Sequence, residues 1–370
     1  MSHPPETPLE FIGMVQPRRQ SEIHPAQGWG IDPGYLRASA QAHDTGGFDR
    51  ILIGWFSNGP DGLQIATHAA AHTERVSLLV AHRPGFQAPT TAARAFATLD
   101  QLSAGRAAIH VITGGDDAEQ HRDGDWLDKD ARYARTDEYV GILKRIWTES
   151  APVDHEGPHY RIVGASTELR TRQRPRIPIY FGGASDAAID VAGRHADVYA
   201  LWGETHAQVR EIIARVRASA ARYGREPRFS LSFRPILAAT ESDAWARAED
   251  ILATIKRLRG EGPLGPPRTD PPNAGSQRLL AAAALGDRPE GRLYTAIAAA
   301  TGARGNTTAL VGTPEQVAEA FLEYHALGVT TFLIRGFDPL EDAAEYGRSL
   351  LPATKRLLAE RLAARRVAAE

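Results

Sequence analysis

The sequence has 370 residues, a formal net charge of −2, 42% hydrophobic residues and no cysteine. A charge so close to neutral argues against nucleic-acid binding, because no basic excess exists to neutralise phosphates. The lack of cysteine excludes disulfides, thiolate metal sites and cysteine nucleophiles. The first 30 residues contain no continuous apolar core of a signal peptide, and no stretch approaches the length of a membrane span. We therefore expect a cytoplasmic protein without a membrane segment.

Strand and helix signals alternate through the first half of the chain. Apolar strand-like runs at 11–15 and 50–54 are each followed by a helical pattern, at 33–45 and 61–72. The strand at 77–81 breaks at Pro84 and Gly85, and a helix from Pro89 leads to a strand at 107–112. This last stretch is a βαβ unit with a crossover of parallel-sheet length.

The alternation continues in the second half. A periodic helix at 131–148 and a hairpin-like insertion at 153–164 precede strands at 177–181 and 198–201. Strands at 229–237 and 330–334 complete a set of eight. Eight strands alternating with helices predict one α/β domain over residues 1–370, a (β/α)8 TIM barrel with insertions. The alternative is a doubly wound sheet, which is disfavoured because no G-x-G-x-x-G follows a strand.

One segment, residues 258–308, interrupts the alternation between strands seven and eight. It is rich in glycine and proline around a short Ala/Leu helix pattern. Compact domains seldom carry so long an irregular insertion unless it has a function. Its place at the catalytic end of a barrel predicts an active-site lid, and the alternative is a disordered surface excursion.

The segment YFGGASD at 180–186 carries a ligand-binding signal. A strand ends, two glycines allow close approach to the backbone, and a helix begins with Ser185 and Asp186. Free N–H groups and the positive end of the helix dipole suit a phosphate at such a terminus. An ordinary capped helix after a tight turn explains the pattern equally well.

Polar residues also follow other strands at the end where barrels build active sites. These residues are His82, Arg83, His110 and Thr113, with Trp202 after strand six. Trp202 would form either one wall of an aromatic pocket or part of the barrel rim. By contrast, HEGPH at 155–159 is not a zinc motif, because Gly-Pro forbids the helix that would align its histidines, so no metal is expected.

Two arginines end the last two strands. Arg234 shares a strand face with Ser232, and Arg335 follows the apolar run at 331–334. A guanidinium in such a place is costly unless it is paired. The partner would be a protein carboxylate, for which the sequence offers Glu204, Asp338 and Glu341, or an anionic substrate gripped by the guanidinium fork.

The sequence resembles the bacterial-luciferase-like flavin monooxygenases, and within them the alkanesulfonate monooxygenase branch. The resemblance covers nearly the whole chain. It rests on the order and spacing of GGFDRILIG, PTTAAR with TLDQLSAGRA, VITGG, DARY, IYFGGASD, YALWGE, TALVGTPEQVA and GFDPLEDA.

The resemblance implies a fold, a cofactor and partners. The family folds as an insertion-bearing (β/α)8 barrel, takes reduced FMN from a separate NAD(P)H-dependent flavin reductase, binds O2 and cleaves a carbon–sulfur bond to release sulfite. It implies that Gly182, Gly183, Ala184 and Ser185 hold the FMN phosphate. It also places His110, Thr113 and Tyr133 around the flavin, Trp202 in the substrate pocket and a mobile loop between strands seven and eight. A homo-oligomer, dimer or tetramer, is expected as well.

The chain departs from the branch on the substrate side. The cysteine typical of the loop after strand two is replaced by Asn58 or Gly59, and an arginine–histidine pair on strand seven by Ser232 and Arg234. A tyrosine after strand eight is replaced by Phe337, and an asparagine of strand four by His110. The lid arginine has an offset counterpart in Arg304.

These departures define the expected substrate site. Its substrate-binding residues are Asn58, His82, Trp202, Ser232, Arg234 and Arg335. Its catalytic residues are His110, as a proton shuttle, with Arg234, Arg304 and Arg335 as the anion clamp. Cationic and hydrogen-bonding groups together favour a hydroxylated sulfonate such as a sulfosugar of the sulfoquinovose type. The alternatives are a related flavin monooxygenase acting on a sulfone or another uncharged substrate, and a non-catalytic flavin-binding barrel.

Overall fold

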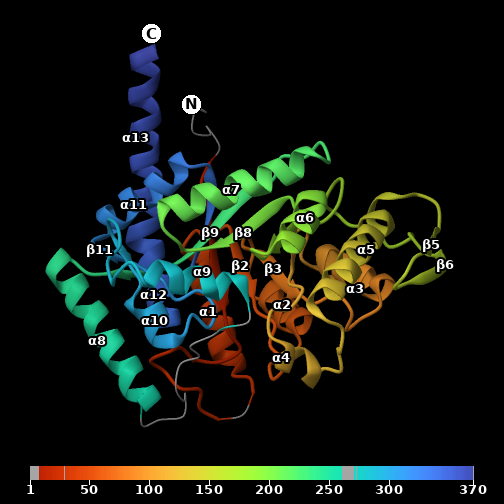
Figure 1. The fold of residues 1–370 in the computed structure, drawn as a ribbon, viewed down its shortest axis with the longest axis horizontal. Coiled ribbons are helices and arrows are strands. Elements are labelled where there is room, and N and C mark those ends of the chain that lie inside the picture. The colour runs from red at the N-terminus through yellow and green to blue at the C-terminus, as the bar shows by residue number, and fades with distance from the viewer. Residues whose placement is uncertain (1–7, 29, 261–270, 272, 370) are drawn as a thin grey trace.

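Eight parallel strands close into a barrel in the computed structural model, which describes residues 8–28, 30–260, 271 and 273–369 (Figure 1). β1 pairs with both β2 and β12, and this double pairing closes the sheet. The barrel strands are β1 (Glu10–Val15), β2 (Arg50–Ile53), β3 (Ser77–His82), β4 (Ala107–Val111), β7 (Ile179–Gly182), β8 (Val198–Trp202), β9 (Arg228–Leu237) and β12 (Val329–Ile334). The predicted fold class is confirmed, and each predicted strand end lies within two residues of the observed one.

Helices surround the barrel and cover its outer surface (Figure 1). Those that follow the barrel strands are α1 (Pro33–Thr45), α2 (Gly62–Ala71), α3 (Pro89–Leu102), α5 (Lys129–Thr148), α6 (Asp186–His195), α7 (His206–Ala221) and α8 (Glu241–Gly260), with α11 (Pro314–Ala326) before β12. Side chains that accept from backbone N–H groups begin most of them, such as Asp32 at α1 and Thr205 at α7. None of the described helices combines the length and apolarity needed to cross a bilayer.

The side chains that point into the barrel change from apolar in its middle to polar at one end of its axis. The middle of the interior is apolar and holds Ile12, Leu79, Ala108, Tyr180 and Val198. Because side chains on one strand face recur every second residue, Ala108 is followed by His110 toward the carboxyl end of β4. On β9 the same spacing gives Ser230, Ser232 and Arg234, all of which line one cavity. The polar end of the barrel is therefore the carboxyl end of its strands.

The hairpin of β5 (Val153–Glu156) and β6 (Arg161–Ala165) carries the HEGPH sequence. His155 lies on a strand and its Nε2 contacts Glu138 Oε1 at 2.8 Å. The expectation that no helix forms here is confirmed. No group of three or more histidine, aspartate or glutamate side chains that could hold a metal occurs among the residues that the structure describes.

The insertion after β9 is largely folded where the structure describes it. It contains α9 (Ala274–Ala283), β10 (Leu293–Tyr294) and α10 (Ala296–Thr301), followed by β11 (Ala309–Gly312). The sequence signals did not predict β11, which pairs with the second half of β9 from Arg234 to Leu237. Of these elements, β10, α10 and β11 pack with α8 around a small core of their own that includes Ile236, Tyr294 and Ile297. The Gly/Pro-rich positions at 262–267 and 272 lie outside the described residues.

A short helix, α4 (Asp117–Arg122), lies between β4 and α5. The chain ends with three consecutive helical pieces after β12. These pieces are α12 (Pro339–Glu345), a π-helical turn (Tyr346–Leu350) and α13 (Leu351–Ala369). The end of α13 extends beyond the barrel (Figure 1). The Tyr346 hydroxyl donates to the carbonyl of Pro235 at 2.5 Å, which ties this terminal segment to β9.

Candidate active site

Two adjoining cavities open at the carboxyl ends of the barrel strands. The smaller, about 320 Å³, is bounded by the Gly182–Ser185 loop and is called the loop cavity. The larger, about 750 Å³, is bounded by Arg234 and Arg335 and is called the arginine cavity. His110 and Trp202 line both cavities, so a ligand in one lies beside a ligand in the other. Together they form the expected active-site end of the barrel.

The Gly182–Ser185 loop connects β7 to α6. The Ser185 side chain caps α6 by accepting from the N–H of Ala188 at 3.3 Å. Gly183 has φ +140, and a Cβ on it would lie 2.7 Å from the Cβ of Ala188 and 3.0 Å from the Tyr133 hydroxyl. The Tyr199 hydroxyl donates to the Gly183 carbonyl and holds the loop from the other side. The glycine backbone thus forms a cradle that a side chain would fill.

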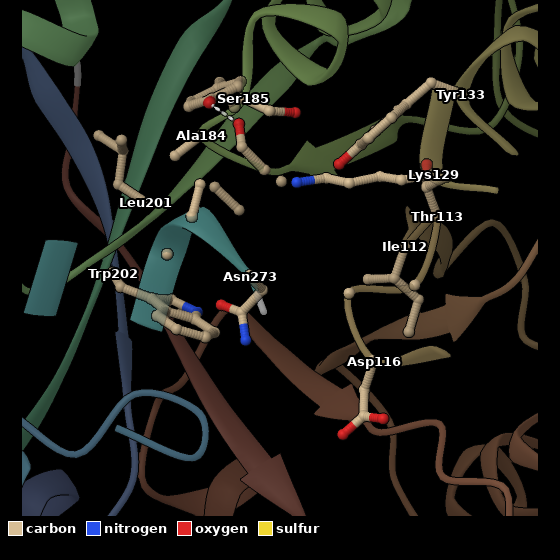
Figure 2. Close-up of a pocket in the computed structure, with 18 of the residues that line it drawn as sticks. Ile112, Thr113, Asp116, Lys129, Tyr133, Ala184, Ser185, Leu201, Trp202 and Asn273 are labelled. Atoms are coloured by element: carbon tan, nitrogen blue, oxygen red, sulfur yellow. Dashed lines mark hydrogen bonds between the residues drawn. The ribbon is translucent and has the colours of Figure 1, made fainter. Parts of the chain in front are cut away.

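Two side chains of α5 face this cradle across the loop cavity. Figure 2 shows Lys129 and Tyr133 extending toward Ala184 and Ser185. Tyr133 is 8% exposed, and burial raises the pKa of its hydroxyl. Lys129 was not singled out from the sequence. Among the described residues no carboxylate pairs with its side chain. An unpaired ammonium, a glycine cradle and a helix N-terminus together fit the phosphate of a mononucleotide.

His110 and Thr113 line the loop cavity from β4 and the loop after it. The Thr113 hydroxyl donates to that of Thr136 at 3.3 Å. The Nδ1 atom of His110 is buried without a hydrogen-bond partner among the described residues. Burial also lowers the pKa of His110 to about 4, so its imidazole is uncharged at neutral pH. The expected role as a proton shuttle that titrates near neutrality does not fit this environment, whereas a neutral hydrogen-bonding role does.

The arginine cavity holds the two predicted arginines, and their partner is a carboxylate that the sequence analysis did not consider. Glu22 lies in the loop between β1 and α1. Its Oε2 accepts from Arg234 Nη2 at 2.9 Å, and its Oε1 accepts from Arg335 Nη2 at 2.8 Å. Burial alone would raise the pKa of Glu22, but the two guanidiniums outweigh it and hold that pKa well below its usual range. Glu22 is therefore a permanent anion in this site.

Arg234 is fixed almost entirely by the protein. It is 1% exposed, and besides Glu22 it donates to the carbonyls of Arg335 and Gly336, both at 2.8 Å. The Phe337 ring lies 3.8 Å from its guanidinium carbon. Arg335 is more open, with a side chain 20% exposed. Burial and the neighbouring Arg234 lower the pKa of Arg335 to about 10, so it is still a cation at neutral pH.

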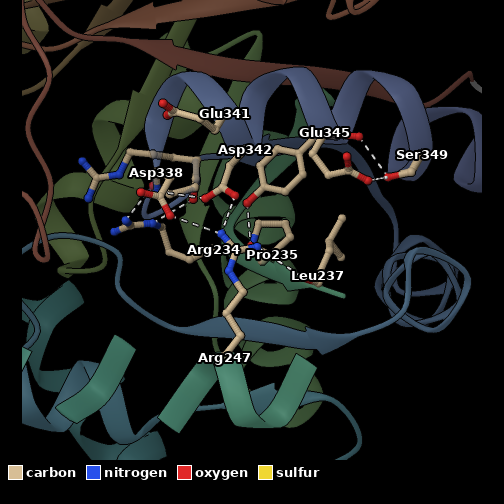
Figure 3. Close-up of polar contacts among 12 residues, drawn as sticks. Arg234, Pro235, Leu237, Arg247, Asp338, Glu341, Asp342, Glu345 and Ser349 are labelled. Carbon is tan, nitrogen blue, oxygen red and sulfur yellow. Dashed lines mark hydrogen bonds and ion pairs between the residues drawn. The ribbon is translucent and has the colours of Figure 1, made fainter. Parts of the chain in front are cut away.

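The three carboxylates that the sequence offered to these arginines have other partners. Glu204 accepts from Arg278 of α9 at 2.7 Å. Arg247 of α8 pairs with Asp342 at 2.6 Å and with Asp338 at 3.4 Å (Figure 3). Glu341 lies near Arg19, with 3.6 Å between Oε1 and Nη2. These three carboxylates are therefore paired with other arginines, and the carboxylate that binds Arg234 is Glu22.

Other predicted substrate residues line the arginine cavity. Asn58 and Ser232 lie on its wall, and the exposed Arg304 lies at its rim. The Ser232 hydroxyl accepts from Asn306 Nδ2 at 3.0 Å, which joins β9 to the insertion. Trp202 packs beside Gly275, where a Cβ would lie 3.0 Å from the indole. The described part of the insertion is thus one wall of both cavities.

His82 is the one predicted substrate residue that the structure does not bring into either cavity. It is 2% exposed, and its Nε2 lies 2.7 Å from the Tyr139 hydroxyl of α5. The Phe96 ring packs edge-on against it, with centroids 5.4 Å apart. Its side chain points to the helix layer because β3 alternates its faces and Ala81, not His82, points inward. Sequence spacing placed the residue at the correct strand end but on the wrong face.

Buried histidines make the fold sensitive to acid. Burial lowers the pKa of both His43 and His82 to about 4 from an ordinary value of 6.5. The unfolded chain therefore takes up protons below 6.5 that the folded chain does not. We expect the free energy of unfolding to fall as the pH drops from about 6.5 to 4, by up to about 3 kcal/mol for each histidine. Urea unfolding measured across this pH range checks the result.

The substitution His82→Asn keeps an uncharged polar group and removes the titration. In this variant the free energy of unfolding should lose the part of its pH dependence that comes from His82. His121→Gln, at an exposed position, should keep the wild-type pH dependence. An unchanged pH dependence in His82→Asn would contradict the prediction.

A barrel whose mouth carries a glycine cradle beside a polar cavity has the architecture expected of a cofactor-dependent barrel enzyme. The family described as luciferase-like monooxygenase matches residues 9–331, and the chain belongs to this family. Membership makes it a flavin-dependent monooxygenase in class, an oxidoreductase.

Solved structures with the same fold include three enzymes of different chemistry. Riboflavin lyase RcaE, solved with modified FMN and riboflavin, has a TM-score of 0.75 at 20% identity, over 96% of this chain and 92% of that one. EDTA monooxygenase EmoA from Chelativorans sp. BNC1 has a TM-score of 0.74 at 18% identity, over 94% of each chain. The type II Baeyer–Villiger monooxygenase of Pseudomonas putida, in complex with FMN, has a TM-score of 0.63 at 16% identity, over 92% and 96%. At these identities the likeness concerns the fold.

Proposed function

We propose that the chain is the oxygenase of a two-component system that uses reduced FMN and O2 to cleave the carbon–sulfur bond of an organosulfonate. A separate NAD(P)H-dependent flavin reductase supplies the reduced FMN. One sulfonate, one O2 and one reduced FMN give one carbonyl product, one hydrogen sulfite, one oxidised FMN and one water. The observation that carries the proposal is the phosphate cradle of the loop cavity directly beside a cavity with an accessible guanidinium.

The residues that would hold the cofactor are those of the loop cavity. The Gly182–Ser185 backbone and Lys129 bind the phosphate, and Tyr133 closes the cavity beside them. Thr113 and His110 lie on the barrel side of the same cavity. When bound, the reduced flavin supplies two electrons to O2. His110 donates or accepts a hydrogen bond as a neutral imidazole, so it orients polar atoms and carries no charge.

The substitution Lys129→Gln tests the phosphate assignment. Removing one charge-assisted contact costs about 1.5–3 kcal/mol, so we expect FMN affinity to fall roughly ten- to a hundredfold. Riboflavin lacks the phosphate, and its affinity should hardly change. Fluorescence titrations with both flavins measure the two affinities, and Lys144→Gln, on the same helix outside the cavity, is the control. An equal loss for FMN and riboflavin would show that Lys129 does not bind the phosphate.

On the substrate side, Arg335 and Arg304 would contact the sulfonate. Arg234 uses Nε and Nη2 to bind Glu22 and two carbonyls, so it positions Arg335 and the turn after β12, and only its Nη1, which has no partner among the described residues, remains for the substrate. Asn58, Ser232 and Trp202 line the remaining wall and suit a carbon skeleton that carries hydroxyl groups. A sulfosugar of the sulfoquinovose type fits this combination of one anionic group and several hydroxyls.

A second candidate is a monooxygenase for a sulfone or another uncharged substrate. The observation that favours it is Glu22, which already satisfies one donor of each arginine. Sulfite release discriminates between the candidates, with the protein incubated with reductase, FMN, NADH, O2 and a panel of sulfonates and sulfones. Sulfite from a sulfonate supports the first candidate, and turnover of sulfones alone supports the second. No turnover with any compound, despite flavin binding, would indicate a flavin-binding barrel without this activity.

A further inference from the structure

Glu22 is a resident carboxylate within the proposed substrate cavity. Its two oxygens are divided between two guanidiniums, 2.9 Å from Arg234 and 2.8 Å from Arg335. Its side chain is 16% exposed, and the Arg234 side chain is 1% exposed. A shielded cluster of two cations and one anion carries one net positive charge, and its interactions are screened little by solvent.

The other charged residues that line the cavity are Asp116, Glu119, Arg122 and Arg304. Asp116 accepts from the N–H of Glu119 at 3.3 Å at the start of α4, and Arg259 of α8 lies close enough to Glu22 to interact with it electrostatically. Glu119 is paired with Arg83 at 2.5 Å, and Arg122 donates to the Ser57 hydroxyl at 3.2 Å. Arg304 is exposed at the rim, where solvent weakens its effect. Between the rim and the cluster the wall is neutral and polar, with Ser230, Ser232 and Asn306. A ligand that reaches Arg335 therefore meets the one net positive charge of the Glu22, Arg234 and Arg335 cluster beside uncharged hydrogen-bonding groups, while Asp116 and Arg122 lie elsewhere on the cavity lining.

We infer that Glu22 determines substrate specificity by leaving the Arg234–Arg335 pair with a single net positive charge, which restricts the cavity to substrates with one anionic group. A substrate with a second anionic group would bring it close to the Glu22 carboxylate, and like charges at close range repel. The inference rests on the proposed function, since it assumes that the arginine cavity receives the substrate.

The test compares ligands of similar size that differ in charge. Butanesulfonate carries one negative charge, sulfopropanoate carries two, and methyl propyl sulfone carries none. Calorimetric titration of the full-length protein gives the dissociation constant of each. Wild-type protein should bind butanesulfonate roughly tenfold or more tightly than sulfopropanoate, because the second charge approaches Glu22. In Glu22→Gln, which keeps the shape of the side chain, this preference should fall roughly tenfold.

Two control variants separate the effect of the Glu22 charge from other effects. One changes the shape of this side chain, and the other changes the net charge of the protein. Glu22→Asp shortens the side chain but keeps the carboxylate, so the preference for one anionic group should persist. Glu241→Gln removes a carboxylate that lies outside the cavity, with a side chain 47% exposed, and should change nothing. A Glu22→Gln protein that is folded by circular dichroism and keeps the wild-type preference within twofold overturns the inference.

If Glu22→Gln does not fold, Arg335→Gln gives the complementary test. This variant leaves Arg234 and Glu22 as a neutral pair, so both anions should lose affinity relative to the sulfone. If both anions keep their wild-type affinities relative to the sulfone in Arg335→Gln, the inference is also overturned. Failure of the proposed function is distinguishable, because it shows as no sulfite from any sulfonate in wild-type protein, whereas the binding preferences still decide the role of Glu22.

Discussion

Replacing Gly183 by alanine is expected to abolish flavin binding. The backbone at φ +140 is one that residues with a side chain rarely adopt, and the new Cβ would lie 2.7 Å from the Cβ of Ala188. Strain and overlap together cost about 3 kcal/mol or more, and the loop can relieve them only by leaving its cradle. We expect the affinity for reduced and oxidised FMN to fall at least roughly a hundredfold, measured by fluorescence titration.

The matched control is Gly141→Ala. Gly141 lies within α5, no atom comes within 4 Å of a Cβ built on it, and its backbone is helical. This variant should bind FMN as the wild type does and should be more stable by about 0.5–1 kcal/mol, because alanine favours the helix. Normal FMN affinity in a folded Gly183→Ala protein would contradict the assignment of the cradle.

Replacing Arg234 by leucine is expected to act on stability first. The substitution leaves the Glu22 carboxylate with one partner and exposes two buried carbonyls, of Arg335 and Gly336, to an apolar side chain. Removing one partner of a buried ion pair costs about 3–5 kcal/mol in the free energy of unfolding. Urea unfolding monitored by circular dichroism measures this loss.

Arg361→Leu is the control for Arg234→Leu. Arg361 pairs with Glu319 on the surface, with a side chain 42% exposed, so its removal should cost less than about 1 kcal/mol. If Arg234→Leu unfolds at the wild-type urea concentration and changes only the KM for substrate, its guanidinium serves the substrate and not the fold.

The barrel and the cofactor wall follow from local sequence signals. Buried parallel strands read as short apolar runs, and most helices begin at a capping residue, so neither depends on knowing the distant parts of the fold. The glycines of the Gly182–Ser185 loop are visible for the same reason, since a strand, two glycines and a helix cap are consecutive in the chain. His110 and His82 were both singled out as polar residues at strand ends, and of the two only His110 lines a cavity in the structure.

The substrate side depends on pairings between distant parts of the chain. Glu22 lies 212 residues from Arg234 and 313 from Arg335 along the chain, so no spacing could relate them. β11 is four residues long and lies outside the barrel, between β10 and the outer half of β9, which a search for eight barrel strands does not anticipate. Lys129 precedes the strong periodic pattern of its helix and resembles a surface lysine. Strand-face errors such as that at His82 arise when a fully buried strand shows no polar alternation.

The ten-residue length of β9 has a consequence for how this enzyme could diversify. Its first half belongs to the barrel and its second half carries β11, so the insertion is attached through its own hydrogen bonds and its own small core. Most of the wall proposed for the flavin comes from β4, β7, β8 and α5, and the insertion adds only residues 273–275 to it. Evolution can therefore exchange most of the substrate wall while most of the proposed cofactor wall is inherited unchanged. Homologues with one shared cofactor and many substrates are the expected outcome of such modular descent.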